Sequence, residues 1–245
     1  MLPSANQRRN KLLAHMPSGV AELLCPHLEP VELKYRQRIE QPNREIRSAI
    51  FVEEGLASVV ATSSAGRKQA EVAIVGNEGM TGLSLLLGGG KSDYDVFMQV
   101  AGCGHSISAE ALGELTRASF ELSSWLLRYA HLYTVQLAHT ALANAQASIE
   151  ERLARWLLMA NDRLGGKDIA LTHDLLALML GVRRAGVTVA LHHLQTKGRV
   201  ALFRGVIQVL DRTGLEQDAG GFYGAPEQAY GKFTDSGGFY EASLH

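Results

Sequence analysis

Apolar and polar positions follow two different periods along the chain. Between about residues 31 and 100, short runs rich in β-branched and aromatic residues are separated by turn signals such as Glu54-Gly55. The clearest of these runs are AIFVEE, LASVVAT, QAEVAIV and VFMQVAG. Short strands at roughly regular spacing predict a small all-β barrel or sandwich. One or two short helices are expected before it, over residues 7–25.

A helical period replaces the strand pattern from about residue 109 to residue 164, where there is no proline and, after Gly113, no glycine. Its apolar positions form two adjacent stripes, and such a helix can contact its own domain and a partner at once. We therefore expect a dimerisation helix over residues 109–147; the alternative is a single buried core helix. The expected dimer contacts lie on the first stripe, at Trp125, Tyr129, Leu132, Gln136 and His139.

A third pattern, of helix, turn, helix and hairpin, covers residues 168–210. Thr172 can cap a first helix, and Gly181 ends it. The second helix begins near Arg183-Arg184, and its apolar side is expected to pack on the first helix: Val187, Ala190, Leu191 and Leu194. Two helices joined by a tight glycine turn are typical of a helix-turn-helix, and VALF-RG-VIQVL predicts a hairpin wing. The alternative is a plain two-helix packing unit.

The charge distribution favours DNA as a partner of this region. The whole chain has a formal net charge of −1, so a nucleic-acid role needs a local basic patch. Residues 168–212 supply one, with six Lys or Arg against three Asp, a net charge of +3. The candidate DNA contacts are Thr172, Arg183, Arg184, Ala185, Thr188, Val189, His192, Lys197, Arg199 and Arg204.

Several other classes of function are disfavoured. Only two cysteines occur, without a Cys-x-x-Cys motif, and His192-His193 point about 100° apart on a helix, so we expect no metal site. GGGKS lacks the first glycine of a phosphate-binding loop, and no catalytic constellation is evident, so we expect neither an enzyme nor a cofactor. No run of about 20 apolar residues and no signal peptide is found. We expect a soluble cytoplasmic protein without a membrane partner.

The ordered series of motifs resembles the Crp-Fnr superfamily of bacterial transcription regulators. The resemblance covers residues from about 17 to 212 and includes EEGLASVV, IVGNEGMTGL, ERLARWLL and LTHDLLALMLGVRRAGVTVALHHL. It implies an α+β fold: a cyclic-nucleotide-binding-like β-roll (a jelly roll), a long dimerisation helix and a C-terminal winged helix-turn-helix. The expected segments are residues 1–108, 109–147, 148–212 and a tail rich in glycine and aromatic residues, 213–245, whose order the sequence does not decide.

The resemblance also implies an effector pocket in the β-roll, at Gly76, Glu78, Gly79, Leu83, Asp95 and Val96. Relatives that bind cyclic AMP have an acidic residue where this chain has Leu83, and an Arg-Ser pair where it has Asp95 and Val96. A carboxylate repels a phosphate, so we expect an effector other than cyclic AMP. A haem-type sensor that uses His15, His27 or His105 stays open as an alternative.

The second helix of the helix-turn-helix departs from the resemblance as well. Arg184 matches the guanine-contacting arginine, but Ala185 replaces a glutamate and Val189 a second arginine. We therefore expect a homodimeric regulator that binds an unusual near-palindromic operator, with RNA polymerase as a possible partner. The alternative is a sensor or interaction module whose winged helix no longer binds DNA.

Overall fold

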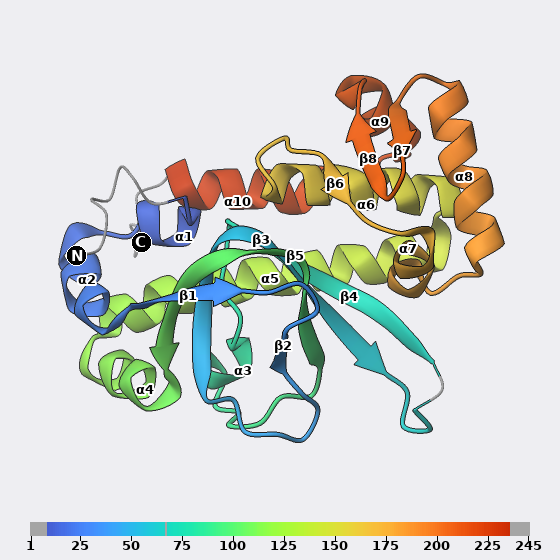
Figure 1. Ribbon diagram of the computed structural model, residues 1–245. Helices are drawn as coiled ribbons and strands as arrows, with labels where there is room; N and C mark the ends of the chain where they lie inside the picture. The colour runs from blue at the N-terminus through green and yellow to red at the C-terminus, as the bar shows by residue number, and fades with distance from the viewer. Residues whose placement is uncertain (1–8, 67, 236–245) are drawn as a thin grey trace, which may run out of the picture.

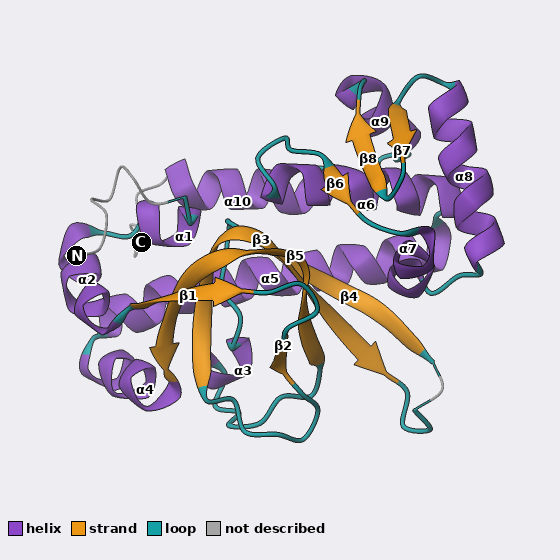
Figure 2. Ribbon diagram, viewed as in Figure 1, coloured by secondary structure: helices purple, strands orange, loops and turns teal. Residues whose placement is uncertain are grey.

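The computed structural model describes residues 9–66 and 68–235. The start of the expected segment 1–108, Arg67 and the end of the expected tail 213–245 (residues 1–8 and 236–245) lie outside the described residues. A β-roll lies at the centre of the molecule, and a long helix runs behind it (Figure 1). A small helical domain with its own hairpin lies at one end (Figure 2).

The β-roll is an antiparallel sheet with the order β1-β5-β3-β4, to which β2 adds beside β5. Its strands are β1 Glu29–Leu33, β2 Arg38–Glu40, β3 Ser48–Thr62, β4 Gln69–Val75 and β5 Asp95–Ser108. The runs AIFVEE and LASVVAT, which the sequence separates by a turn signal, belong to one strand, β3. Gly55 keeps this strand continuous with a φ of +95°, and a Cβ there would lie 2.6 Å from the Val100 carbonyl oxygen.

Short helices close the β-roll and complete its core. They are α1 Lys11–Ala14, α2 Ser18–Leu24, the 3₁₀ turn η2 Cys25–His27 and α3 Leu83–Leu86. The first two confirm the helices expected over residues 7–25. Asn10 caps α1, and its side-chain amide also donates to the carbonyls of Val52 and Gly79, at 2.8 and 2.7 Å. The N-terminal segment is thereby fixed to the β-roll.

The expected dimerisation helix is two helices rather than one. Helix α4 spans Ala109–Ala118 and α5 spans Phe120–Gln146. Ser119 interrupts them with an extended backbone, and its side chain accepts the Leu122 N–H as the N-cap of α5. Ser148 then caps α6, Ile149–Arg163, in a capping box with Glu151, as its spacing predicts.

The C-terminal domain is a winged helix-turn-helix. Helix α7 spans His173–Leu180 and α8 spans Arg184–Thr196, with Gly181 between them in the left-handed region. The wing is the sheet β6-β8-β7, made of β6 Ile169–Ala170, β7 Val200–Phe203 and β8 Val206–Val209. The predicted inner side of α8 is buried: Val187, Ala190, Leu191 and Leu194. The tail adds α9 Arg212–Asp218 and α10 Ala225–Asp235.

The β-roll and the C-terminal domain share one hydrophobic core. Leu56 and Ile74 of the sheet pack in the same cluster as the apolar side of α6 and the inner side of α8. Within the described residues no single helix is long and apolar enough to cross a membrane. Helices α7 and α8 reach that length and hydropathy only together, and they are bent by 107°.

Candidate DNA-binding surface and effector cavities

The first turns of α8 form the exposed face of the helix-turn-helix. Arg184, Ala185, Val189 and His192 are exposed on it. Thr188 is half-buried, and its hydroxyl lies 3.1 Å from the ring Nδ1 of His173 in a hydrogen bond. This face therefore offers one long cation, two apolar groups and an imidazole to a partner.

Arg184 is free enough to reach a partner. Its Nε lies 3.4 Å from Oδ1 of Asp174, but the two side chains are 65% and 69% exposed. An ion pair so exposed contributes little to stability, so breaking it costs little. Arg183, the N-cap residue of α8, and Arg204 are exposed too, and neither has an ion-pair partner among the described residues.

The opposite end of α8 is occupied by ion pairs inside the domain. Lys197 Nζ lies 2.6 Å from a carboxylate oxygen of Glu150 and 2.8 Å from one of Asp218. Arg199 pairs with Asp218 at 2.9 Å and also with Asp211. Hydrogen bonds to Asp218 and Glu150 raise the pKa of Lys197. Lys197 and Arg199 thus join α6, α8 and α9. Their phosphate contacts stay a prediction, against which these ion pairs count.

The wing and the start of α7 border a cleft beside Arg184. The cleft has a volume of about 280 Å³, and His173, Asp174, Arg184 and Phe203 are among its lining residues. The Thr172 hydroxyl accepts the Leu175 N–H, so its side chain is used as a helix cap. Phe203 is 62% exposed next to the hairpin turn. His173 and Phe203 border this cleft but are not among the predicted DNA contacts, because the apolar pattern of the wing gives Phe203 no separate signal.

A cavity of about 300 Å³ lies between the β-roll and α5. Leu83 and Val96 line it, as do Asp93 and Lys91, and Tyr133 closes it from α5. Glu40 lies in its wall, where it accepts hydrogen bonds from the Gly82 N–H at 2.7 Å and the Ser92 hydroxyl at 2.8 Å. Burial raises the pKa of Glu40, although these hydrogen bonds oppose the shift. Two carboxyl groups and one ammonium group therefore face this cavity.

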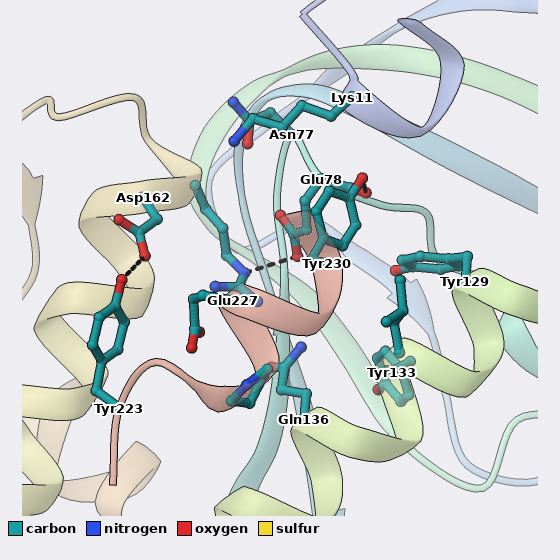
Figure 3. Close-up of a pocket in the computed structure, with 13 residues that line it drawn as sticks. Lys11, Asn77, Glu78, Tyr129, Tyr133, Gln136, Asp162, Tyr223, Glu227 and Tyr230 are labelled. Atoms are coloured by element: carbon teal, nitrogen blue, oxygen red, sulfur yellow. Dashed lines mark hydrogen bonds and ion pairs between the residues drawn. The ribbon is translucent and has the colours of Figure 1, made fainter. Parts of the chain in front are cut away.

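The other predicted effector residues lie outside the β-roll cavity. The carboxylate of Asp95 is 3.5 Å from the guanidinium of Arg38. Gly76, Glu78 and Gly79 lie at the junction with the C-terminal domain, where Glu78 pairs with Arg163 at 2.8 Å (Figure 3). None of these three lines the β-roll cavity, so their assignment to an effector pocket stays a prediction that this placement does not favour.

Close packing, rather than a ligand, explains the glycines at this junction. A Cβ on Gly79 would lie 2.1 Å from the Tyr129 hydroxyl, and one on Gly76 would lie 2.6 Å from the Cβ of Arg163. Glycine at these two positions lets the loop after β4 approach α5 and α6 closely.

The predicted dimer stripe on α5 mostly faces its own chain. Trp125 donates its indole N–H to the Leu12 carbonyl at 3.2 Å, and Gln136 exchanges hydrogen bonds with the backbone of Ile74. The Tyr129 hydroxyl bonds to the backbone of Met80. Trp125, Tyr129 and Gln136 are buried within their own chain, which counts against the prediction that they form a dimer interface. Leu132 and His139 are half-buried.

A different face of α5 is exposed and follows the spacing of a coiled coil. Its positions are separated by alternating steps of four and three residues, which keep them on one side of a helix. They are Leu127, His131, Thr134, Ala138, Ala141 and Ala145. Sequence reasoning missed this stripe because alanine, threonine and histidine are weak signals of an apolar face.

No group of three His, Cys, Asp or Glu side chains that could hold a metal ion occurs among residues 9–66 and 68–235. The fold and the surface on α8 thus define a class of protein: a β-roll joined through a long helix to a winged helix-turn-helix.

Comparisons with known proteins agree with this class. Residues 151–218 match the family of Crp-like helix-turn-helix domains. A putative Crp/Fnr-family regulator from Eubacterium rectale is 20% identical, with a TM-score of 0.65 over 83% of this chain and 94% of that one. FixK2 from Bradyrhizobium japonicum is 17% identical, with a TM-score of 0.67 over 78% and 96%.

The regulator CLP from Xanthomonas campestris, described as responsive to c-di-GMP, is 15% identical, with a TM-score of 0.63 over 80% and 100%. No curated protein sequence matches the chain significantly. The chain thus contains a Crp-like helix-turn-helix domain and has the fold of the Crp/Fnr transcription regulators, which confirms the resemblance found in its sequence.

Proposed function

We propose that this Crp/Fnr-type protein regulates transcription as a homodimer that binds a near-palindromic DNA site with sequence specificity. The observation that carries the proposal is that the two sides of α8 differ in exposure. Its apolar side is buried in the Crp-like domain, while Arg184, Ala185 and Val189 are exposed at its start. The N-terminal part of a recognition helix is the part that reaches base edges in the major groove.

The chemistry of this face suggests which bases it contacts. The guanidinium of Arg184 can donate two hydrogen bonds to O6 and N7 of a guanine. Ala185 and Val189 have no side-chain hydrogen-bonding group, but each fits against the methyl group of a thymine. Arg183 and Arg204 suit phosphates on either side, which fixes the orientation of the domain without selecting a base.

The exposed stripe on α5 supports a homodimer. Its small side chains, from Thr134 to Ala145, let two copies of the helix approach closely in a coiled coil. A two-fold axis there would direct two copies of α8 toward half-sites about 34–36 Å apart. A contact with RNA polymerase stays a prediction.

The β-roll cavity is the proposed effector site, and its charges disfavour cyclic AMP. Asp93 and the buried Glu40 face the space, opposed by Lys91. A phosphate placed there would meet carboxylates and lose water without full compensation. CLP is described as responsive to c-di-GMP, which also carries phosphate, so this part of the proposal rests on the charges of the cavity and not on that relative. A calorimetric titration that finds micromolar binding of cyclic AMP would contradict this part.

Genomic footprinting of the protein tests the DNA-binding proposal, because it reports the site and the neighbouring genes together. A mobility-shift titration on the recovered site at several salt concentrations follows, and affinity should fall steeply as salt rises. Shuffled DNA of the same composition is the control. Equal affinity for both sequences, or no binding at low salt, favours the alternative of an interaction module without specific DNA binding.

A further inference from the structure

The C-terminal tail crosses from the helix-turn-helix domain to the β-roll. After α9, Gly220, Gly221 and Gly224 adopt positive φ values, and the chain turns back. The Tyr223 hydroxyl bonds to Asp162 of α6 at 2.6 Å. The Phe222 carbonyl accepts a hydrogen bond from Arg155, also of α6, at 3.1 Å. This part of the tail is therefore attached to the C-terminal domain.

The far end of α10 is attached to the β-roll side. Phe233 is 4% exposed, and its ring centroid lies 4.4 Å from that of Trp125 on α5. The guanidinium of Arg128 lies 4.9 Å from the same ring. The Tyr230 hydroxyl donates to the Glu78 carbonyl in the loop after β4. Helix α10 thus bridges the two halves of the molecule, and Figure 1 shows it running back above α5.

A cavity of about 280 Å³ lies beneath this bridge. Its walls come from α1, the loop after β4, α5, α6 and the tail (Figure 3). Its size is just below the range of about 300–1,000 Å³ that is usual for small-molecule pockets. It is separate from the β-roll cavity, and Tyr133 lies in the walls of both.

Most charges in this cavity are satisfied within the protein. Arg163 pairs with Glu78 at 2.8 Å, and Asp162 pairs with Arg212 at 2.8 Å. Lys11 and Glu227 are the exceptions, because neither has an ion-pair partner within 4.0 Å in the described part of the chain, although Glu227 lies within electrostatic range of Arg155 and Arg163. One carboxylate oxygen of Glu227 accepts the Gly224 N–H at 3.0 Å, which leaves the other carboxylate oxygen for a ligand.

Lys11 and Glu227 have opposite charge and lie on different sides of the space. Lys11 is beside Asn77, while Glu227 projects from the start of α10 (Figure 3). Asn77 adds a buried side-chain oxygen that has no hydrogen-bond partner. Between them are tyrosine rings and the apolar side chains of Leu132 and Pro226. The complement of such a site is a small molecule with an anionic end, a cationic end and an apolar part.

We propose that this cavity is a second small-molecule site and that it binds a free amino acid or a zwitterion of the same class. The ligand ammonium group pairs with Glu227, and its carboxylate pairs with Lys11. Both contacts are charge-assisted hydrogen bonds, which are stronger than neutral ones. The apolar part of the ligand packs between the tyrosine rings and Leu132.

Binding at this position would couple the domains. The ligand would touch α10, α6 and the β-roll side at once, so it would stabilise the arrangement in which the tail bridges them. A regulator could thereby respond to an amino acid through its tail. Because Tyr133 lines both cavities, the response could also reach the β-roll cavity. The binding claim itself does not depend on DNA binding.

The test is a thermal-shift screen of the full chain with each proteinogenic amino acid supplied singly at millimolar concentration, followed by calorimetry on those that raise Tm. For a ligand found in this way, the N-acetyl and the amide derivative each lack one charge. Each should bind about tenfold more weakly or worse, because one charge-assisted hydrogen bond is lost.

Matched variants locate the site. Glu227→Gln and Lys11→Met should each weaken binding about tenfold or more, while Lys11→Arg, which keeps the charge, should retain most of it. Lys91→Met, in the β-roll cavity, should leave the affinity unchanged. The unliganded Tm of each variant checks its folding. The proposal is overturned if no amino acid binds, if Glu227→Gln and Lys11→Arg behave alike, or if Lys91→Met abolishes binding.

Discussion

The charged groups at the junction of the two domains and those on the helix-turn-helix surface have opposite environments. At the junction, Arg163 and Glu78 pair with side chains only 8% and 13% exposed, and Glu71 is buried. On the surface, Arg184 and Asp174 are mostly in water. A buried charge is costly to leave without its partner, whereas an exposed one is screened. The junction charges therefore fix the arrangement of the domains, and the surface charges remain available to a partner.

Glu71 connects the two domains at this junction through hydrogen bonds. Its carboxyl group accepts hydrogen bonds from the Trp156 indole N–H, at 2.5 Å, and from the Ser58 hydroxyl. Ser58 in turn lies 3.1 Å from the sulfur of Met179 on α7. One buried acid of strand β4 thus connects the β-roll to α6 and, through Ser58, to α7.

The largest effect should come from breaking the buried ion pair. Arg163→Ala leaves Glu78 buried without its partner and should lower the free energy of unfolding by about 3–5 kcal/mol. Urea denaturation followed by circular dichroism measures it. The double variant Arg163→Met with Glu78→Gln removes both charges and should recover much of the loss. If the single and double variants are equally unstable, lost packing rather than the unpaired charge is the cause.

The next effect is a pH dependence from Glu71. Burial raises its pKa from 4.5 to about 7, against the opposing hydrogen bonds. The folded protein therefore keeps a proton that the unfolded chain releases. Its contribution to stability is full below about pH 4.5 and is lost as the pH rises to about 7. The total is up to about 3 kcal/mol.

Glu71→Gln tests this directly, because the amide keeps a hydrogen-bonding group without a titrating proton. The free energies of unfolding of the protein and the variant are compared between about pH 5 and pH 8, because the stability contribution changes mostly between the unfolded and the folded pKa. The difference should grow as the pH rises, in favour of Glu71→Gln. Parallel curves would mean that Glu71 is ionised throughout.

On the exposed side, Arg184→Ala should leave stability nearly unchanged and weaken specific DNA binding by about 1–3 kcal/mol, with relaxed preference at one base pair. A mobility-shift assay on the site and on single-base variants measures both. Arg204→Ala is the matched control, and it should weaken binding to all sequences alike and reduce the salt dependence. If Arg184→Ala behaves like Arg204→Ala, Arg184 contacts only phosphate.

The smallest effect should follow from Lys197→Ala, which removes ion pairs to Glu150 and Asp218 at the edge of the domain. Its side chain is half-exposed, so the loss of unfolding free energy should be below about 1 kcal/mol. DNA affinity should change little, because Lys197 is already paired. A marked loss of affinity with a smaller salt slope would instead restore Lys197 to the set of phosphate contacts.

Local patterns predicted the elements and the buried side of α8 well. Ser148 with Glu151, Thr172 and Gly181 act over three or four residues, and the structure contains all three helix signals as expected. The burial of Val187 and Leu191 follows from helical period alone. These predictions succeeded because each depends on neighbours in sequence.

Predictions about what a face contacts were less successful. The stripe of Trp125, Tyr129 and Gln136 is apolar enough for a partner, yet its neighbours are Leu12, Met80 and Ile74 of the same chain. Helical period shows that a face will be buried but not against what. The coiled-coil spacing on the other face became visible only once the first face was known to be covered.

The sequence by itself determined the order of the elements, the inner and outer sides of α8, and the resemblance to Crp-Fnr regulators, since these depend on local propensity, periodicity and motif order. Only the tertiary structure decided that Lys197 and Arg199 are paired, that Gly76 and Gly79 serve close packing, and that α10 closes a cavity over α5. Those facts depend on contacts between segments far apart in the chain, and no local pattern specifies such distances.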